Sequence, residues 1–189
     1  MKDLSQILSD ATAAIEWRYF HLAIDGGSPV YRERVYCYEL YHQMRSLWPN
    51  DCPYCVNGEV DKAGHPVLAK VGVGRAIPDL LVHQPGSMRG NYAIIEVKNP
   101  LAPPARIIKD LKKLDLFVRN AGYQRAIYLA YGNDGDRLVG DIIRSAAQLP
   151  ELGSIELWVH QQVGEPAIHR VTLPEGGQSG PTATPTQSR

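Results

Sequence analysis

The sequence has no long hydrophobic segment and no excess of charge of either sign. Its longest apolar stretches fall far short of the roughly 18 residues typical of a membrane span, so we expect no membrane contact. Lysine plus arginine and aspartate plus glutamate number 20 each, so a polyanion would have to bind at a local patch. Only three cysteines occur, an odd count that excludes a disulfide scaffold and favours a reducing compartment. The N-terminal residues lack the apolar run of a signal peptide, which predicts a cytoplasmic protein.

Several catalytic motifs are missing as well. The chain contains no glycine-rich phosphate-binding loop, no G-x-G-x-x-G dinucleotide fingerprint and no G-x-S-x-G nucleophile elbow. Its six histidines show no H-x-x-x-H spacing, which would indicate a metal site on a helix. Nucleotide hydrolysis and serine-hydrolase chemistry are therefore unsupported.

What is present is the composition and periodicity of one mixed α/β domain. Apolar residues make up 44% of the chain, enough for a hydrophobic core, and we expect a single domain over residues 1–173. Residues 174–189 have no large apolar side chain and are predicted to be disordered. Apolar spacing predicts helices at 3–17, 31–47, 105–120 and 136–147. It predicts strands at 59–60, 67–71, 77–83, 92–98, 125–131, 155–160 and 167–171, with a polar loop at 49–58.

Charged residues interrupt two of these predicted strands. Asp79 follows a proline near the start of one, and after sixteen intervening residues Glu96-Val97-Lys98 ends the other. Because side chains alternate along a strand, Glu96 and Lys98 share one face while Val97 points to the other. Buried charges are costly unless they are paired or bind a metal. The sequence therefore predicts that Asp79, Glu96 and Lys98 converge where the strands lie side by side.

Two carboxylates and a lysine suit metal-dependent phosphodiester chemistry. Mg²⁺ prefers carboxylate oxygens, retains several waters and accepts phosphate oxygens, and Mn²⁺ can substitute for it. We expect Asp79 and Glu96 to bind the metal. Lys98 is expected to position or activate the attacking water and to offset transition-state charge.

The motif and its surroundings resemble the PD-(D/E)XK nuclease superfamily. Pro78-Asp79 and Glu96-Val97-Lys98 match its motif, and the resemblance covers residues 31–131. It implies a restriction-endonuclease-like αβββαβ core, here with an extra N-terminal helix and a C-terminal helix plus strands. It also implies a Mg²⁺-dependent deoxyribonuclease, an endonuclease or an exonuclease, acting in defence against foreign DNA or in DNA repair. Cutting both strands of a duplex usually requires two sites, which is compatible with a homodimer.

Many members of this superfamily carry a further acid on the helix that precedes the sheet. Glu33 and Glu39 are available here. Glu39 lies four residues after the apolar Val35, close to the predicted buried stripe, so we expect it to be the additional catalytic acid that assists through a metal-bound water. Glu33, which is further from that stripe, is the second candidate for this acid.

The predicted helix 105–120 carries five basic residues against two acidic ones. A basic strip directly after the motif would suit a phosphodiester backbone. We therefore expect DNA to be the partner, bound through Arg75, Arg106, Lys109, Lys112 and Lys113. The alternative is an ordinary solvated helix surface.

Three other readings remain open. Asp79, Glu96 and Lys98 could form a structural ion-pair cluster that closes the end of a sheet. The chain could instead be a non-catalytic nucleic-acid-binding or protein-interaction subunit on the same fold, with a partner subunit supplying DNA affinity. Cys52 and Cys55 have the spacing of a redox dithiol or of half a zinc site, with His42 and His65 as further zinc ligands, although unrelated loop cysteines fit the context better.

Overall fold

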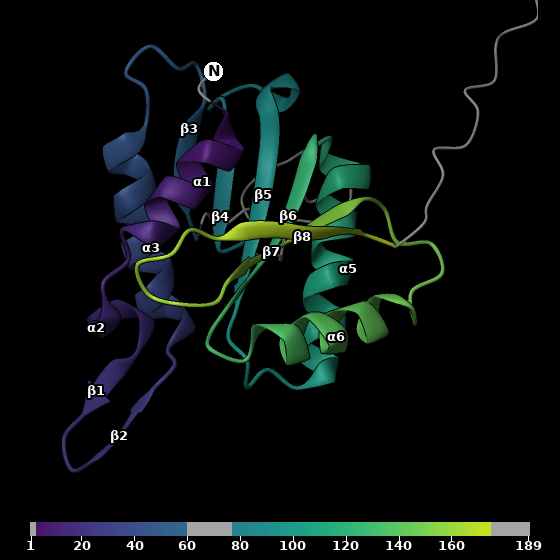
Figure 1. Ribbon diagram of the computed structural model, residues 1–189. Coiled ribbons are helices and arrows are strands. Elements are labelled where there is room, and N and C mark those ends of the chain that lie inside the picture. The colour runs from purple at the N-terminus through teal and green to yellow at the C-terminus, as the bar shows by residue number, and fades with distance from the viewer. Residues whose placement is uncertain (1–2, 60–76, 175–189) are drawn as a thin grey trace, which may run out of the picture.

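The protein folds as a mixed α/β structure built on a six-stranded mixed sheet. The computed structural model describes residues 3–59 and 77–174 (Figure 1). Its elements are α1 (Leu4–Ala13), α2 (Trp17–Phe20), β1 (Leu22–Ile24), β2 (Gly27–Val30), α3 (Glu33–Leu47), β3 (Cys55–Gly58), β4 (Leu80–His83), a 3₁₀ turn (Met88–Gly90), β5 (Asn91–Lys98), α5 (Pro104–Ala121), β6 (Arg125–Tyr131), α6 (Gly135–Ala146), β7 (Ile155–His160) and β8 (Ile168–Leu173).

The six strands lie in sequence order, β3-β4-β5-β6-β7-β8. The pairs β3–β4, β4–β5 and β7–β8 are antiparallel, whereas β5–β6 and β6–β7 are parallel, with α5 and α6 as the crossovers. The run Tyr-Ala-Ile-Ile of β5 and the apolar β6 lie in the centre, because strands covered on both faces must be apolar throughout.

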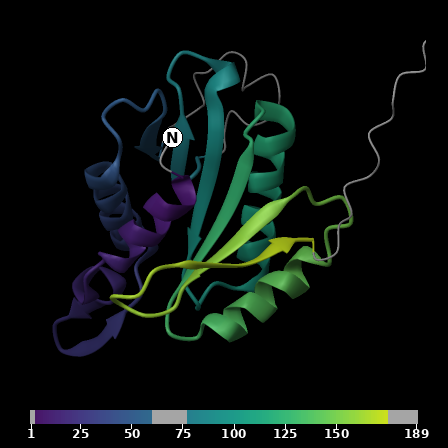
Figure 2. The same cartoon turned by 45° about the horizontal axis from the view of Figure 1, so that its top comes forward.

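Helices cover both faces of this sheet (Figures 1 and 2). On one face α1 and α3 pack against alternate strand residues that include Ile95, Val97 and Leu129. On the other, α5 and α6 pack against Ile94, Tyr128 and their neighbours. Side chains alternate between the two faces along β5, so Glu96 and Lys98 share the face of Ile94 and lie on the α5 side.

Helix α5 has clear start and stop signals. Pro104 occupies its first turn, where a missing N–H costs nothing, and Gly122 follows it with φ of 70°. Apolar residues recur along one side and are all buried against the sheet: Ile107, Leu111, Leu114, Phe117 and Ala121. Its position next to β5 and β6 places its polar side chains within reach of Glu96 and Lys98.

The N-terminal third departs from the predicted elements. The expected helix 3–17 ends at Ala13, and a separate turn of helix, α2, leads into a β1–β2 hairpin that projects from the body (Figure 1). This hairpin was not predicted, because its four-residue second strand contains Gly27 and Pro29 and lacks an alternating apolar pattern. The prediction of a loop over 49–58 is wrong for its last four residues, because Cys55–Gly58 forms β3 and pairs with β4.

The predicted strand 77–83 begins only at Leu80, so Asp79 lies just before the strand. Glu59 is not in a strand, and Val60 and the predicted strand 67–71 lie outside the described residues, as does the tail beyond 174. The predicted strands 125–131 and 155–160 are confirmed, and helices 105–120 and 136–147 are confirmed with ends that shift by one residue. In the described part of the chain, no helix has the length and apolarity needed to cross a membrane.

His160 is a buried histidine at the end of β7. Its Nε2 faces the Gln162 carbonyl oxygen at 3.0 Å, which can only accept, so Nε2 carries the proton. Nδ1 then accepts from the Tyr36 hydroxyl at 2.7 Å. Burial lowers the pKa of His160 to about 4, and the hydrogen bond to Gln162 offsets this only in part.

This histidine predicts a loss of stability in mild acid. Between pH 6.5 and about 4, the unfolded chain binds a proton at position 160 that the folded chain excludes, so stability falls as the pH falls. The shift corresponds to about 3 kcal/mol. Urea unfolding of His160→Asn should show a smaller decline across this interval than the parent protein. His169→Asn, at an exposed position on β8, should leave the decline unchanged. An equal decline in all three proteins would contradict the assignment.

Candidate functional site

Asp79, just before β4, lies beside Glu96 of the neighbouring strand β5. In the antiparallel β4–β5 pair Leu80 is opposite Ile95, so the same register continued by one residue sets Asp79 opposite Glu96 and on the same face. The Asp79 carboxylate accepts a hydrogen bond from the Val97 backbone N–H at 2.8 Å. This contact holds Asp79 against the C-terminal end of β5, directly beside Glu96.

Glu96 is almost completely buried, with 1% of its surface exposed. Its Oε2 accepts a hydrogen bond from Lys113 Nζ at 2.7 Å, whereas Oε1 has no hydrogen-bond partner within the described residues. Burial raises the pKa of Glu96 well above its ordinary value and the nearby charge of Asp79 raises it further, against the opposing effect of Lys113. The site therefore holds a carboxylate with spare capacity for a cation.

Asp79 is in a similar electrostatic position. Burial raises the pKa of its carboxyl group, and the Val97 N–H and the charges of Lys113 and Lys98 offset only part of the increase. Both carboxyl groups therefore ionise less readily than they would in water. Additional positive charge placed between them would relieve this.

Lys98 has different partners from those expected. Its ammonium group contacts Asp110 Oδ2 at 2.8 Å and Glu33 Oε2 at 3.0 Å, and the side chain is buried. Burial lowers the pKa of Lys98, but these two carboxylates more than offset it, so the pKa is raised and the lysine stays charged. Lys98 acts on Asp79 through space, while Lys113 is the lysine that contacts Glu96.

Two residues of α5 complete this group of charged side chains, and their pairing was not predicted from the sequence. Asp110 and Lys113 are three residues apart on the helix and face the sheet, with Lys113 Nζ 3.6 Å from Asp110 Oδ1. Lys113 Nζ also donates to the Ile77 carbonyl oxygen at 3.2 Å, which ties α5 to the segment before Asp79. One signal could have revealed Asp110: it lies three residues after Ile107 and four before Leu114, within the buried stripe.

The α3 acid that contacts these charged side chains is Glu33, whereas the expected Glu39 does not reach them. Glu33 Oε2 contacts Lys98, and its Oε1 accepts from the Asn99 side-chain amide at 2.8 Å. Glu39 instead accepts from Gln43 at 2.6 Å and is not among the residues that contact the cluster. The reason is helical geometry: Glu33 lies one turn before Cys37, which faces the cluster, whereas Glu39 is two residues past it and points elsewhere.

Tyr128 is another polar group that the sequence did not single out. It lies directly beside Glu96 in the parallel β5–β6 register, is fully buried, and its hydroxyl has no hydrogen-bond partner within the described residues. Burial raises the pKa of Tyr128 well above its ordinary value, and the charges of Asp110 and Glu96 add to this. The hydroxyl therefore stays protonated and is available as a donor on the residue beside Glu96.

The cluster carries more negative than positive charge. We define the acidic cluster as the four carboxylates Glu33, Asp79, Glu96 and Asp110 with the two ammonium groups Lys98 and Lys113, which leaves a formal charge of −2 when all are ionised. One divalent cation would balance it. The described residues include no group of three His, Cys, Asp or Glu side chains arranged to bind a metal. Two carboxylates suffice for Mg²⁺, which completes its shell with water and substrate phosphate, so Asp79 and Glu96 fit this ion.

The expected DNA-binding residues divide into three groups. Arg106, Lys109 and Lys112 are exposed on α5, as a basic surface requires. Lys113 is not on that surface, because its side chain turns inward to Glu96. Arg75 lies outside the described residues.

None of the three cysteines belongs to a metal-binding group within the described residues. All three are free thiols. Cys55 lies on β3, with its sulfur 3.1 Å from Asn57 Oδ1, and burial raises the pKa of its thiol. A raised pKa is the opposite of what a reactive dithiol needs. His65 lies outside the described residues, so a zinc site that includes it stays a prediction.

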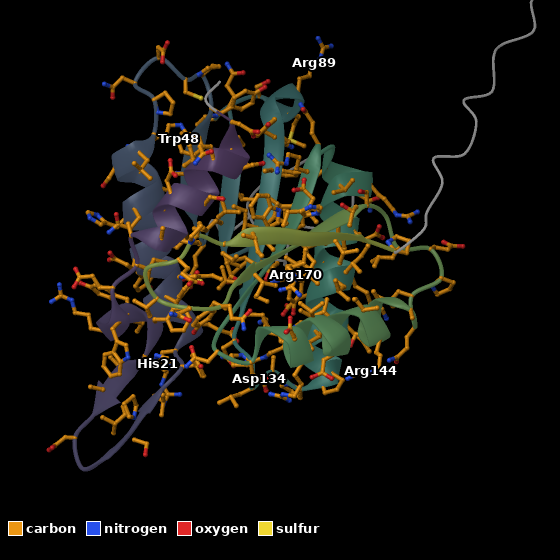
Figure 3. The ribbon with its side chains drawn as sticks, viewed as in Figure 1. His21, Trp48, Arg89, Asp134, Arg144 and Arg170 are labelled. Carbon is orange, nitrogen blue, oxygen red and sulfur yellow. The ribbon has the colours of Figure 1, made fainter. Side chains whose placement is uncertain are left out.

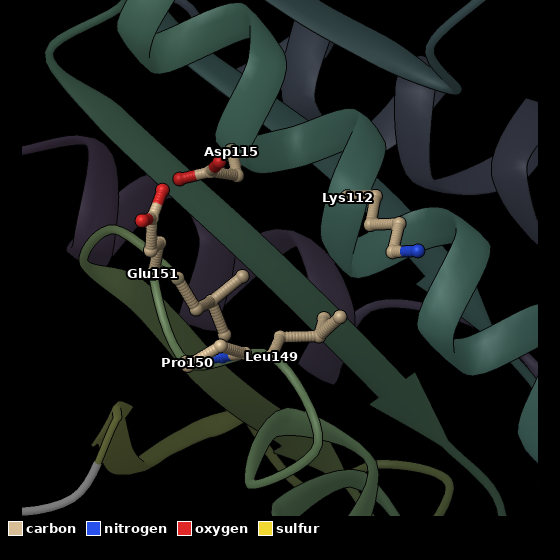
Figure 4. Close-up of a pocket in the computed structure, with 6 residues that line it drawn as sticks. Lys112, Asp115, Leu149, Pro150 and Glu151 are labelled. Atoms are coloured by element: carbon tan, nitrogen blue, oxygen red, sulfur yellow. The ribbon is translucent and has the colours of Figure 1, made fainter.

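Two pockets bear on ligand binding. One of about 400 Å³ opens beside Asp79 and is lined by Tyr38 and Tyr41 of α3 and Asn57 of β3, among others. The other, of about 280 Å³, lies between α5 and residues 149–152 and shares no residue with the acidic cluster (Figure 4). Only the first adjoins the paired carboxylates.

No protein-family profile, curated protein or solved structure matches this chain.

Proposed function

We propose that this chain is a Mg²⁺-dependent nuclease of the PD-(D/E)XK type that hydrolyses DNA phosphodiester bonds. The observation that supports it most strongly is the buried acidic cluster, in which the motif residues Asp79 and Glu96 adjoin and the net formal charge is −2 when all groups are ionised. The order of the described elements adds support, because α3-β3-β4-β5-α5-β6 has the αβββαβ order of that superfamily. The site also lies beside a pocket and an exposed basic helix surface.

Each residue has a role that follows from its contacts. Asp79 and Glu96 would hold Mg²⁺, which when bound polarises a phosphoryl oxygen and acidifies a bound water. The Val97 N–H fixes the orientation of Asp79. Lys98, held by Asp110 and Glu33, keeps a positive charge at a fixed place near the reacting phosphate, where it offsets the charge of the transition state.

A plasmid-nicking assay tests the proposal directly. Purified protein should convert supercoiled plasmid to the relaxed form with Mg²⁺ or Mn²⁺ and stop when a chelator is added. Activity that persists in chelator would exclude the proposed mechanism. Absence of cleavage on duplex, single-stranded and branched DNA would instead favour the second candidate below.

The second candidate is a non-catalytic binding subunit on the same fold. One observation favours it: both lysines and three of the four carboxylates of the acidic cluster already form close ion pairs, at 2.7–3.0 Å. Such a network can stabilise the end of a sheet without any metal. It would be supported if neither Mg²⁺ nor Mn²⁺ altered the unfolding temperature of the protein.

The basic surface of α5 yields a prediction common to both candidates. Replacing exposed Lys109 and Lys112 by alanine should weaken DNA binding by about tenfold at 0.1 M salt and reduce the slope of log affinity against log salt by up to about 1.8. Fluorescence anisotropy with a labelled duplex, measured in chelator, gives both quantities. Arg144→Ala, on exposed α6 (Figure 3), is the matched control and should change neither. Equal losses in the two proteins would place the DNA elsewhere.

A further inference from the structure

Lys113 lies between two carboxylates, and its ammonium group is closer to one than to the other. Its ammonium group is 2.7 Å from Glu96 Oε2 and 3.6 Å from Asp110 Oδ1. The first contact is a hydrogen bond, whereas the second is a longer ion pair. A small rotation of the flexible lysine stem would exchange the two.

The contacts of Asp110 allow it to bind Lys113 more closely. Its Oδ2 already forms an ion pair with Lys98 at 2.8 Å, while Oδ1 has, among the described residues, only the longer ion pair with Lys113. Each lysine can therefore occupy one oxygen of the same buried carboxylate. Lys98 cannot make the complementary move to Glu96 without giving up its contacts with Asp110 and Glu33.

Repulsion between Lys113 and a bound divalent cation would drive this exchange. Lys113 is the only described cation that contacts either proposed metal ligand, and it occupies one oxygen of Glu96. An ammonium group and a divalent cation a few ångströms apart repel each other strongly in a buried site. A cation bound between Asp79 and Glu96 would thus disfavour the Lys113–Glu96 contact and leave the Asp110 contact as the better one.

We infer that Lys113 is a displaceable counter-ion: it occupies Glu96 while no metal is bound, and it moves onto Asp110 when a divalent cation binds Asp79 and Glu96. This inference rests on the proposed function, because it needs the two-carboxylate metal site. It assigns Asp110 the role of receiving the displaced lysine, although Asp110 itself does not bind the metal. Lys113 and Asp110 are positioning residues that set metal affinity.

The inference predicts opposite effects from two neighbouring substitutions. Lys113→Met keeps the length of the stem and removes the competing charge, so Mg²⁺ should bind at least about tenfold more tightly. Asp110→Asn removes the acceptor for the displaced lysine, so Mg²⁺ should bind more weakly. In a double-mutant cycle, Asp110→Asn should cost much less affinity in the Lys113→Met background, because no lysine then needs an acceptor.

Calorimetric titration of the 189-residue chain with Mg²⁺ measures these affinities without DNA. Thermal unfolding provides a second readout: metal-free Lys113→Met should melt lower than the parent protein and gain more from saturating Mg²⁺. Arg119→Met, which removes a charge from the exposed part of the same helix, should leave Mg²⁺ affinity unchanged.

The outcomes separate the two claims. If Asp79→Ala removes Mg²⁺ binding but Lys113→Met leaves it unchanged, the counter-ion inference is wrong and the metal site stands. The inference is also overturned if Asp110→Asn costs the same affinity with and without Lys113. If the parent protein binds no Mg²⁺, or binds it equally well after Asp79→Ala, the proposed metal site fails and the inference falls with it.

Discussion

Replacing Asp79 by alanine should abolish Mg²⁺ binding and DNA cleavage together. Asp79 provides one of only two proposed protein ligands, and Glu96 alone, still paired with Lys113, would hold the ion poorly. We expect cleavage to fall below detection, by at least about a thousandfold. Calorimetric titration and plasmid nicking on the same preparation give both quantities.

Folding must be controlled in this experiment, because Asp79 also accepts a hydrogen bond from the end of β5. Circular dichroism and thermal unfolding should show a folded variant. Asp134→Ala removes an exposed carboxylate before α6 (Figure 3) and should retain full cleavage and metal binding. A folded Asp79→Ala protein that still cut DNA with Mg²⁺ would refute the assignment of this ligand.

Replacing Lys98 by methionine should have a different signature: cleavage collapses while Mg²⁺ binding remains. Lys98 contributes positive charge near the cation, so its removal leaves metal affinity unchanged or higher. Transition-state charge stabilisation is lost, and we expect a decrease in cleavage of about a hundredfold or more. Single-turnover cleavage at saturating Mg²⁺ separates this effect from metal binding.

Stability provides an independent check on Lys98. Without its ammonium group, Glu33 loses its described ion pair and Asp110 keeps only the longer contact with Lys113, so the metal-free variant should be less stable and recover with Mg²⁺. Cleavage at the parental rate would show that Lys98 is structural, even with the fold and the metal site intact.

The central elements were predictable because their local patterns agree with their surroundings. β5 and β6 are apolar throughout, and α5 begins at proline and ends before glycine with a regular stripe between. The same local rules set Glu96 and Lys98 on one face. The β1–β2 hairpin and β3 escaped prediction because short strands near the surface owe their existence to partners that the local sequence does not reveal.

The site itself was only half predictable. The sequence placed Asp79, Glu96 and Lys98 together, but which lysine meets which carboxylate depends on how α5 and α3 dock on the sheet. The basic residues around Lys113 led to the prediction that it lies on the surface, and Asp110 was not singled out. Both side chains turn inward. Helical spacing could not choose between Glu33 and Glu39 until the direction of α3 was known.

Anomalous diffraction from crystals soaked in Mn²⁺ tests the central claim most directly. We expect a peak between Asp79 and Glu96, with an oxygen of each about 2.1 Å away, and Lys113 moved from Glu96 to Asp110. Saturating Mn²⁺ with no peak at these two carboxylates, and Lys113 still on Glu96, would contradict it.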